Sequence, residues 1–365
     1  MPARVTVLEA LRRFLPEFLA TGPALTPQQH RAIWALQNCR TKVLGGRCFR
    51  CPDCRHQQFA WHSCNHKACP QCGRAATADW VRRELAKRVQ APYFLVTFTL
   101  PAQLRDLFFG PHAKEAFDLF FGAAAGALSE KLATAKGLQA TVHGFTAVLH
   151  TWSQQLGFHP HIHCLVPGAG LNRHGRFVRV PDSGYLLHLP LLQAAFRQHL
   201  RRRLEEHQWG VDPAVWRKDW GVHIQPVGDG AAAVKYLGAY VARTALGDSR
   251  LAKLTPETVS FQWKNRDKGN RRETVTLAGV EFVRRYLRHV MPPGLRTIRY
   301  YGFCHPASRA KRLRVQMHSG ARVELGAAPP PPARAPAPVP CCPSCQKPMF
   351  LIDIVPPVHR QRGPP

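Results

Sequence analysis

The sequence predicts an α+β protein in which a helical, cysteine-rich N-terminal module precedes a domain of strands and packed helices. Residues 1–90 combine apolar residues at helical spacing with a dense group of cysteines. In residues 91–310, runs with strand character alternate with amphipathic helical runs. Residues 311–365 begin basic and are dominated by proline and alanine over 327–340, which is typical of a disordered spacer.

Three helices are expected in the N-terminal module. Apolar residues between Val7 and Leu19 recur at helical spacing. Thr26-Pro27 is a typical helix start, and the helix is expected to continue to Leu36. A basic helix should follow the cysteines over residues 75–89. The cysteines themselves lie between the second and third helices.

Both kinds of element are expected in residues 91–310. Apolar and β-branched runs predict strands over 93–100, 141–152, 158–166, 222–226 and 297–303. Helical spacing predicts helices over 111–136 (one long or two short), 189–207, 231–244 and 278–290. Turn residues between alternating runs predict hairpins over 168–180 and 258–277.

The charge balance points to a polyanionic partner. Lys and Arg number 51 against 22 Asp and Glu, for a net charge of +29, which favours nucleic acid over membranes or heparin-like targets. The hydrophobic fraction of 45% is enough for a sizeable core and excludes wholesale disorder. We expect no signal peptide and no transmembrane segment, and hence a soluble protein in a reducing, intracellular setting.

Two Cys-x-x-Cys knuckles predict a structural zinc site. Cys51-Pro-Asp-Cys54 and Cys69-Pro-Gln-Cys72 each aim two thiolates at one ion, and together they would complete a tetrahedral four-cysteine site. Such a site has no open position for chemistry, so its expected role is to hold a basic surface against DNA.

Other potential ligands are left over from this assignment. They could bind a second zinc, replace one of the four, or simply pack: Cys39, Cys48, Cys64, His62 and His66. Cys64 is the candidate extra ligand of the first site. The tail motif Cys342-Pro-Ser-Cys345 is only half a site.

Three histidines alternate along one predicted strand. In His159-Pro-His161-Ile-His163, strand alternation places the three imidazoles on one face. Imidazoles two residues apart on a strand can converge on one cation. The cluster therefore favours metal or phosphate chemistry over histidines that merely line a polar sheet face.

Two tyrosines lie one turn apart on a predicted helix. Tyr236 and Tyr240 are four residues apart and so share a helix face. Aromatic pairs at this spacing are usually part of a core. A tyrosine phenolate is, however, a competent nucleophile toward a phosphodiester when a nearby cation polarises the phosphate.

Together these motifs resemble the two-tyrosine HUH endonucleases, named for their His-hydrophobe-His motif, and the order of parts resembles the rolling-circle transposases of the insertion sequence ninety-one family. The resemblance covers about residues 5–310. It is carried by Cys39-Arg-Thr41 with Leu44-Gly-Gly46, the two knuckles with Ser63-Cys64, His159–His163, Lys235–Val241, and the late segment 282–303.

The resemblance implies a metal-dependent DNA transposase. His161 and His163 would hold Mg²⁺ or Mn²⁺, and Tyr236 or Tyr240 would attack single-stranded DNA at the element's ends. The products would be a 5′-phosphotyrosine and a free 3′-OH, and the second tyrosine would serve a second cleavage or transfer to target DNA. Candidates for a third metal ligand are His159, Gln154, Gln155 and His150.

The resemblance also implies a fold and a location. The histidines should lie on a central strand of an antiparallel sheet with packed helices, facing the helix that carries the tyrosines. The protein should act at the nucleoid in the bacterial cytoplasm.

Three other interpretations remain open. A histidine-triad nucleotide hydrolase or transferase would use His161 as its nucleophile and would need no metal. A non-enzymatic zinc protein that binds nucleic acid would explain the charge and the cysteines alone. A relaxase or replication initiator would share the chemistry but serve other biology.

Overall fold

The computed structural model describes residues 5–72, 74–135, 138–217, 220–241, 245–265, 268–321 and 339–358. The chain divides into two compact units. The first unit comprises residues 1–75, 242–290 and 325–365, and the second comprises 76–241 and 291–324. Most of the spacer predicted over 327–340 lies outside the described residues.

Two helices of the first unit begin at capping boxes. In α1 (Val7–Ala20) and α2 (Pro27–Asn38), capping boxes pair Thr6 with Glu9 and Thr26 with Gln29, which satisfies backbone groups at each start. The short η1 (Lys42–Leu44) follows α2. Helix α7 (Gly279–Leu287) packs on α1, and a Cβ at Gly279 would lie only 2.0 Å from the Phe14 ring.

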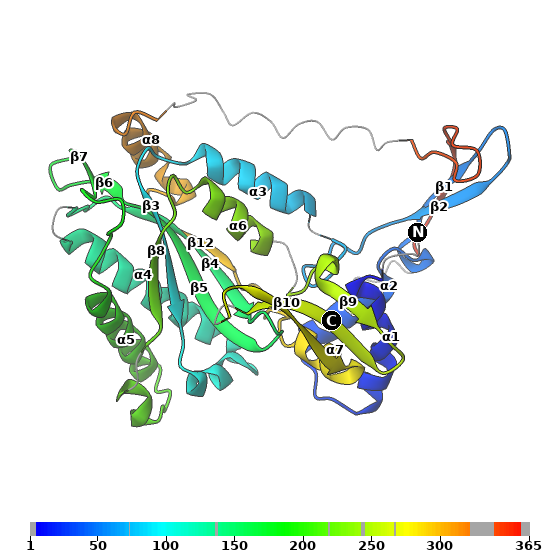
Figure 1. Ribbon diagram of the computed structural model, residues 1–365, viewed down its shortest axis with the longest axis horizontal. Helices are drawn as coiled ribbons and strands as arrows, with labels where there is room; N and C mark the ends of the chain where they lie inside the picture. Colours follow the sequence, from blue (N-terminus) through cyan, green and yellow to red (C-terminus); the bar gives the residue numbers. More distant parts are fainter. Residues whose placement is uncertain are drawn as a thin grey trace. The chain divides into compact units, whose positions relative to one another are not determined.

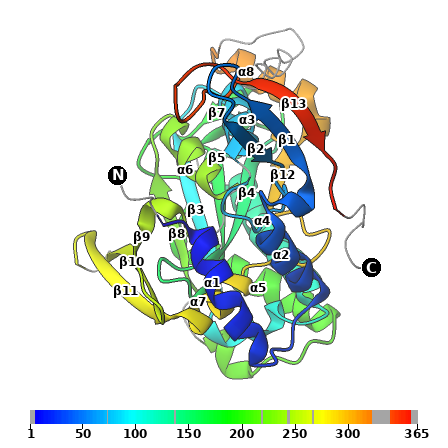
Figure 2. The ribbon, with the colours of Figure 1, turned by 90° about the vertical axis from the view of Figure 1, so that its right-hand side faces the viewer.

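Two small antiparallel sheets belong to this unit. One has the order β13-β1-β2 and consists of β13 (Phe350–Val355), β1 (Gly46–Arg50) and β2 (Gln57–Trp61), and Figure 2 shows β13 beside β1. The other has the order β11-β10-β9, from β9 (Leu251–Leu254), β10 (Thr258–Asn265) and β11 (Arg271–Ala278). The hairpin expected over 258–277 is therefore confirmed, whereas β13 was not predicted.

A five-stranded sheet forms the centre of the second unit. Its order is β12-β4-β5-β3-β8, and every neighbouring pair is antiparallel. The strands are β3 (Tyr93–Thr99), β4 (Gly144–Trp152), β5 (Phe158–Pro167), β8 (Val222–Pro226) and β12 (Ile298–Gly302). The expected antiparallel sheet is confirmed, and the strand with the histidines is its middle strand.

Helices cover both faces of this sheet (Figure 1). On one face α4 (Ala113–Thr134) and α5 (Leu189–Glu206) pack against side chains such as Phe94 and Ile162. On the other face α3 (Arg74–Ala86) and α6 (Ala231–Val241) pack against Leu95 and Leu165, together with α8 (Arg309–His318). The region expected as one or two helices over 111–136 is a single long helix.

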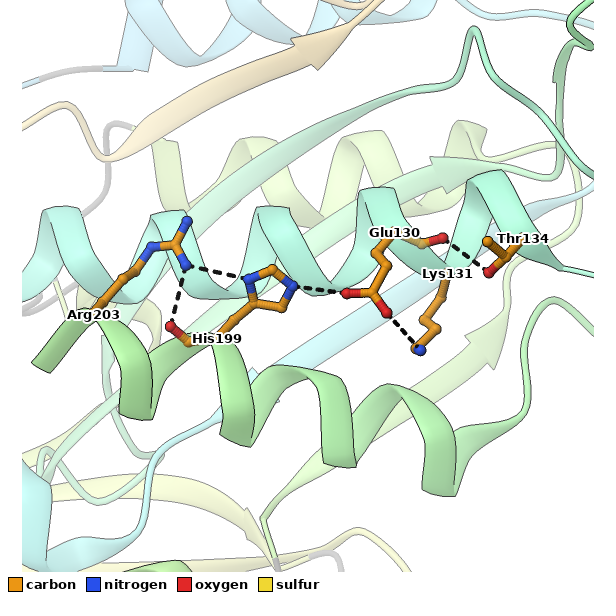
Figure 3. A network of polar contacts seen from close by, with 5 residues as sticks. All are labelled: Glu130, Lys131, Thr134, His199 and Arg203. Atoms are coloured by element: carbon orange, nitrogen blue, oxygen red, sulfur yellow. Dashed lines mark hydrogen bonds and ion pairs between the residues drawn. The ribbon is translucent and has the colours of Figure 1, made fainter. Parts of the chain in front are cut away.

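Two glycines let α5 lie close to α4. A Cβ at Gly122 would lie 2.9 Å from Nε of Arg203, and a Cβ at Gly126 would lie 2.9 Å from Nδ1 of His199. On the same helix pair, His199 contacts Glu130 through Nε2 at 2.9 Å, as Figure 3 shows. The small residues of α4 thus make room for polar side chains of α5.

Short elements complete the second unit. The hairpin of β6 (Ala169–Leu171) and β7 (Phe177–Arg179) confirms the one expected over 168–180. The 3₁₀ turns η2 (Ala102–Phe108), η3 (Pro213–Arg217) and η5 (Pro306–Ser308) lie in this unit, and η4 (Asp248–Arg250) lies in the first. No helix in the described part of the chain is both long and apolar enough to cross a bilayer.

Candidate functional site

Three histidines gather on one face of the central sheet. His161 and His163 lie on β5, and His150 lies on β4 directly opposite His161. One ring nitrogen of each lies within 4.8 Å of the others. Because alternate residues of a strand share a face, these side chains lie on the face that α3 and α6 cover. The arrangement suits one cation held by three imidazoles.

Hydrogen bonds orient two of these rings. Nδ1 of His161 lies 2.8 Å from the carbonyl oxygen of His159. A carbonyl only accepts, so Nδ1 carries the proton and Nε2 presents its lone pair. Nδ1 of His163 lies 2.8 Å from Oγ1 of Thr97, on the neighbouring strand β3. Contacts of this kind fix the ring orientation of metal-binding histidines.

Burial keeps the third histidine neutral. The pKa of His150 is lowered well below its usual value, first by burial and then by the nearby His163 and His161. A neutral imidazole is the form that binds a metal ion. His150 can therefore bind a divalent cation without first losing a proton.

His159 lies beside His161 on the same face, as strand alternation predicted, but it is not a member of this group. Its ring centroid lies 5.4 Å from that of His161. Its Nδ1 lies 2.8 Å from Nη2 of Arg105. Between the pairs His150–His161 and Trp152–Phe158, β5 has one residue more than β4, a bulge that includes Pro160. The structure thus groups His150, one of the four candidates, with the pair.

Tyr236 reaches the histidines from α6. Its ring centroid lies 6.1 Å from that of His163, with the ring planes 79° apart. Tyr236 is 38% exposed, so part of the residue faces solvent. The side chain of Tyr240 lies outside the described residues, and only its place on α6 is defined.

Several contacts fix α6 in place. Asp229 accepts a hydrogen bond from the backbone N–H of Ala231 and pairs with Arg88 at 2.6 Å, which ties the start of the helix to the residues after α3. Buried Val234 and Leu237 anchor the inner face of α6. A Cβ at Gly238 would lie 2.2 Å from Cγ2 of Val81, so only glycine permits this approach to α3.

A buried carboxylate and an indole fix α3 against the sheet. Glu84, which is 6% exposed, accepts hydrogen bonds from Thr146 on β4 at 3.1 Å and from Lys87 at 2.6 Å. Trp80 donates to the hydroxyl of Tyr300 on β12 at 3.0 Å. Burial, followed by the charge of Glu84, raises the pKa of Tyr300 to about 12. This phenol therefore stays protonated and structural.

Four cysteines converge in the first unit. Cys39, Cys64, Cys69 and Cys72 bring their sulfurs within 4.8 Å of one another. The Sγ atoms of Cys39 and Cys64 each lie 3.8 Å from that of Cys72. Zinc–sulfur bonds of about 2.3 Å in a tetrahedron place sulfurs roughly 3.8 Å apart, whereas a disulfide needs about 2.05 Å. The geometry is that of a zinc site.

The structure corrects the predicted grouping of cysteines. Cys51 and Cys54 do not join Cys69 and Cys72, and they lie instead with two cysteines of the C-terminal segment. Spacing of the Cys-x-x-Cys type fixes which two thiols share a turn, but not which turns meet. Cys64, the candidate extra ligand, is in the Cys69 group, and so is Cys39 at the end of α2.

Two transposase families match the chain. Residues 144–312 match the family described as "Putative transposase", and residues 10–100 match "Transposase zinc-binding domain". The three clustered histidines and Tyr236 lie in the first segment, and the Cys39 group lies in the second. The match to a zinc-binding domain and the clustered cysteines together support a structural zinc in this part of the chain.

Two curated proteins are similar over most of the chain. "Putative transposase y4qJ" of Sinorhizobium fredii is 33% identical over 353 residues, which cover 91% of this chain and 87% of that protein. "Transposase for insertion sequence element IS801" of Pseudomonas savastanoi pv. phaseolicola is 30% identical over 284 residues, which cover 73% of this chain and 67% of that protein. No solved structure matches. The chain therefore belongs to the insertion sequence ninety-one family of transposases and has an N-terminal zinc-binding domain.

Proposed function

We propose that the protein nicks single-stranded DNA at the ends of its element and transfers the strand through a phosphotyrosine bond. The observation that carries the proposal is the position of Tyr236, a partly exposed residue whose ring lies 6.1 Å from that of His163, one of three clustered histidines. A transposase needs a nucleophile and an electrophilic activator at one point, and these residues supply both.

His150, His161 and His163 would hold a divalent ion, Mg²⁺ or Mn²⁺, and the donors fit one. Nitrogen ligands suit Mn²⁺ better than Mg²⁺, because Mg²⁺ prefers oxygen. When bound, the ion would polarise the scissile phosphate and offset its negative charge. The protein's own contribution is rigidity, because two rings are oriented by hydrogen bonds and the third is buried.

Tyr236 supplies the nucleophile in this proposal. Its hydroxyl oxygen forms a bond to phosphorus as the bond to the 3′ oxygen breaks. The phenol gives up its proton and the departing 3′ oxygen takes one up. Because one phosphate ester bond replaces another, the step needs no outside energy source. Attack of a free 3′-OH on the phosphotyrosine then restores a DNA linkage, and Tyr240 would serve the second cleavage or transfer.

Charge supports DNA as the substrate of this chemistry. When a chain with a net charge of +29 binds DNA, its basic side chains would release many counterions from the phosphate backbone. Single-stranded DNA at the element's ends is the proposed substrate and target DNA the acceptor, as the resemblance to the two-tyrosine HUH endonucleases implies. Because each cleavage would cut only one DNA strand, transposition would follow a rolling-circle route.

A covalent-adduct assay tests the proposal. The protein is mixed with Mn²⁺ and labelled single-stranded oligonucleotides that carry the element's ends, and the products are separated on a denaturing gel. A labelled protein band that EDTA abolishes is expected, with the same sequence in duplex form as the control. The band should survive acid treatment, as phosphotyrosine does. An acid-labile band would indicate phosphohistidine and would contradict the proposal.

Gly238→Ala is expected to slow adduct formation without unfolding the protein. The added methyl group would lie 2.2 Å from Cγ2 of Val81 and push α6 away from α3. A displacement of about 1 Å at a reacting group can lower a rate about a hundredfold. The initial rate of the adduct assay measures the effect.

Val81→Ala provides the matched control for this prediction. It removes the atom that the new methyl group meets, so the double variant should recover most of the rate. If the double variant is as slow as Gly238→Ala alone, the close approach of the helices is not what positions Tyr236.

A further inference from the structure

The C-terminal cysteines lie outside the matched zinc-binding domain but belong to the same compact unit. We propose that Cys51, Cys54, Cys342 and Cys345 bind a second zinc ion, which fastens the C-terminal segment 339–358 to the N-terminal hairpin of β1 and β2. The segment 339–358 would then be an integral part of the zinc-binding domain.

Sulfur positions fit a single tetrahedral ion. Sγ of Cys51 lies 3.4 Å from that of Cys345, and Sγ of Cys54 lies 3.4 Å from that of Cys342. A third separation, between Sγ of Cys345 and Sγ of Cys54, is 3.7 Å. These distances are close to the roughly 3.8 Å of a four-thiolate zinc site and far beyond the length of a disulfide.

The two Cys-x-x-Cys turns share one backbone pattern. Cys51 accepts from the N–H of Arg55 at 3.1 Å and donates to the carbonyl of His56 at 2.9 Å. In the same positions, Cys342 accepts from Gln346 at 2.8 Å and donates to Lys347 at 2.8 Å.

The residue after each second cysteine also has the same conformation. Arg55 and Gln346 have φ values of 60° and 59°, which non-glycine residues rarely adopt. Two unrelated stretches of sequence therefore form the same knuckle, and the knuckles face one another across four thiols. This match is the strongest argument for a shared metal ion.

Further contacts hold the C-terminal segment beside the N-terminal hairpin. Strand β13 pairs with β1 from Gly46 opposite Val355 to Arg50 opposite Phe350 (Figure 2). Beyond the strand, the N–H of Val358 donates to the carbonyl of Val43 at 3.1 Å.

A glycine makes room for this docked segment. A Cβ at Gly45 would lie 2.6 Å from the carbonyl oxygen of Val355, and its φ of 69° also favours glycine. The hairpin is therefore shaped to receive the segment.

Side chains around the sulfurs also hold the C-terminal segment to the hairpin of β1 and β2. Lys347 pairs with Asp53 at 2.7 Å, so each knuckle supplies one partner of the ion pair. Met349 is 1% exposed and packs on Cys51 and Cys342. Apart from the backbone pairing of β13, the segment has only this ion pair and one buried methionine to hold it, and so small a core is the usual reason for a structural metal in a small module.

Metal analysis of the purified full-length protein tests this inference. The two cysteine groups predict about two zinc ions per chain. The double variant Cys342→Ser plus Cys345→Ser should keep about one zinc, and so should Cys51→Ser plus Cys54→Ser. Cys341→Ser is the matched control, because Cys341 is exposed and lies outside both groups, and it should keep two. Two zinc ions in the Cys342/Cys345 variant, one in the unaltered protein, or iron in place of zinc would overturn the assignment.

Hydrogen exchange supplies a second readout that does not depend on metal content. Amides of residues 351–355 should be protected in the unaltered protein and in Cys341→Ser. They should exchange at least tenfold faster in the Cys342/Cys345 variant, while β10 and β11 stay protected as a measure of intact folding. Unchanged protection of β13 in that variant would show that the ion does not fasten the segment.

Discussion

Replacing Tyr236 by phenylalanine is expected to reduce covalent adduct formation on the order of a thousandfold or more, because the variant has no oxygen to attack phosphorus. The ring itself remains, so its contact with His163 and the packing of α6 should persist. The measurement is the initial rate of the labelled protein band under saturating Mn²⁺.

Two controls make the Tyr236 result interpretable. DNA binding, measured by fluorescence anisotropy with EDTA present, should change less than about twofold, since the hydroxyl is a small part of a highly cationic surface. Tyr300→Phe removes a phenol that stays protonated beside Trp80, and it should retain the adduct. Full activity of Tyr236→Phe would transfer the nucleophilic role to Tyr240.

The second large effect concerns the identity of the third metal ligand. His150→Ala should weaken Mn²⁺ binding at least a hundredfold and abolish the adduct at low metal concentration, because it removes one of the three clustered nitrogens. His159→Ala should leave the Mn²⁺ affinity within a few-fold of the original value, since His159 contacts Arg105 and lies outside the cluster. Isothermal titration with Mn²⁺ measures both.

Burial of His150 requires a further comparison. Its side chain is 2% exposed, so His150→Ala leaves a cavity and should lower the free energy of unfolding by about 2 kcal/mol. His150→Gln fills more of the space, yet it should still lose Mn²⁺ affinity. If His150→Gln binds Mn²⁺ normally while His159→Ala does not, the assignment of the third ligand is reversed.

Periodicity predicted the architecture of the second unit well. The spacing of His161 and His163 and the apolar neighbours of β5 indicate a strand, and the structure places that strand in the middle of the sheet. The choice of the third histidine could not be derived in the same way. His159 does share the face of His161, but its contact with Arg105 and the place of His150 opposite His161 are decided by tertiary contacts.

The grouping of the cysteines could not be predicted from the sequence either. The knuckles at Cys51 and Cys69 are evident from spacing, but which knuckles share a site depends on how the hairpin of β1 and β2 directs each of them. A usable signal was present in the tail, where the apolar run Phe350–Val355 follows a complete Cys-x-x-Cys turn. Long-range pairing of this kind is decided by tertiary contacts and not by local propensity.

Pairing of β1 with β13 also sets an order for biosynthesis. Cys51 and Cys345 are 294 residues apart in the chain. At about 5–20 residues per second, the ribosome would make the second knuckle roughly 15–60 s after the first. During that interval the nascent hairpin has an open edge and two thiolates without their partners. The zinc-binding domain of a newly made transposase therefore completes its folding only after the ribosome has translated the second unit.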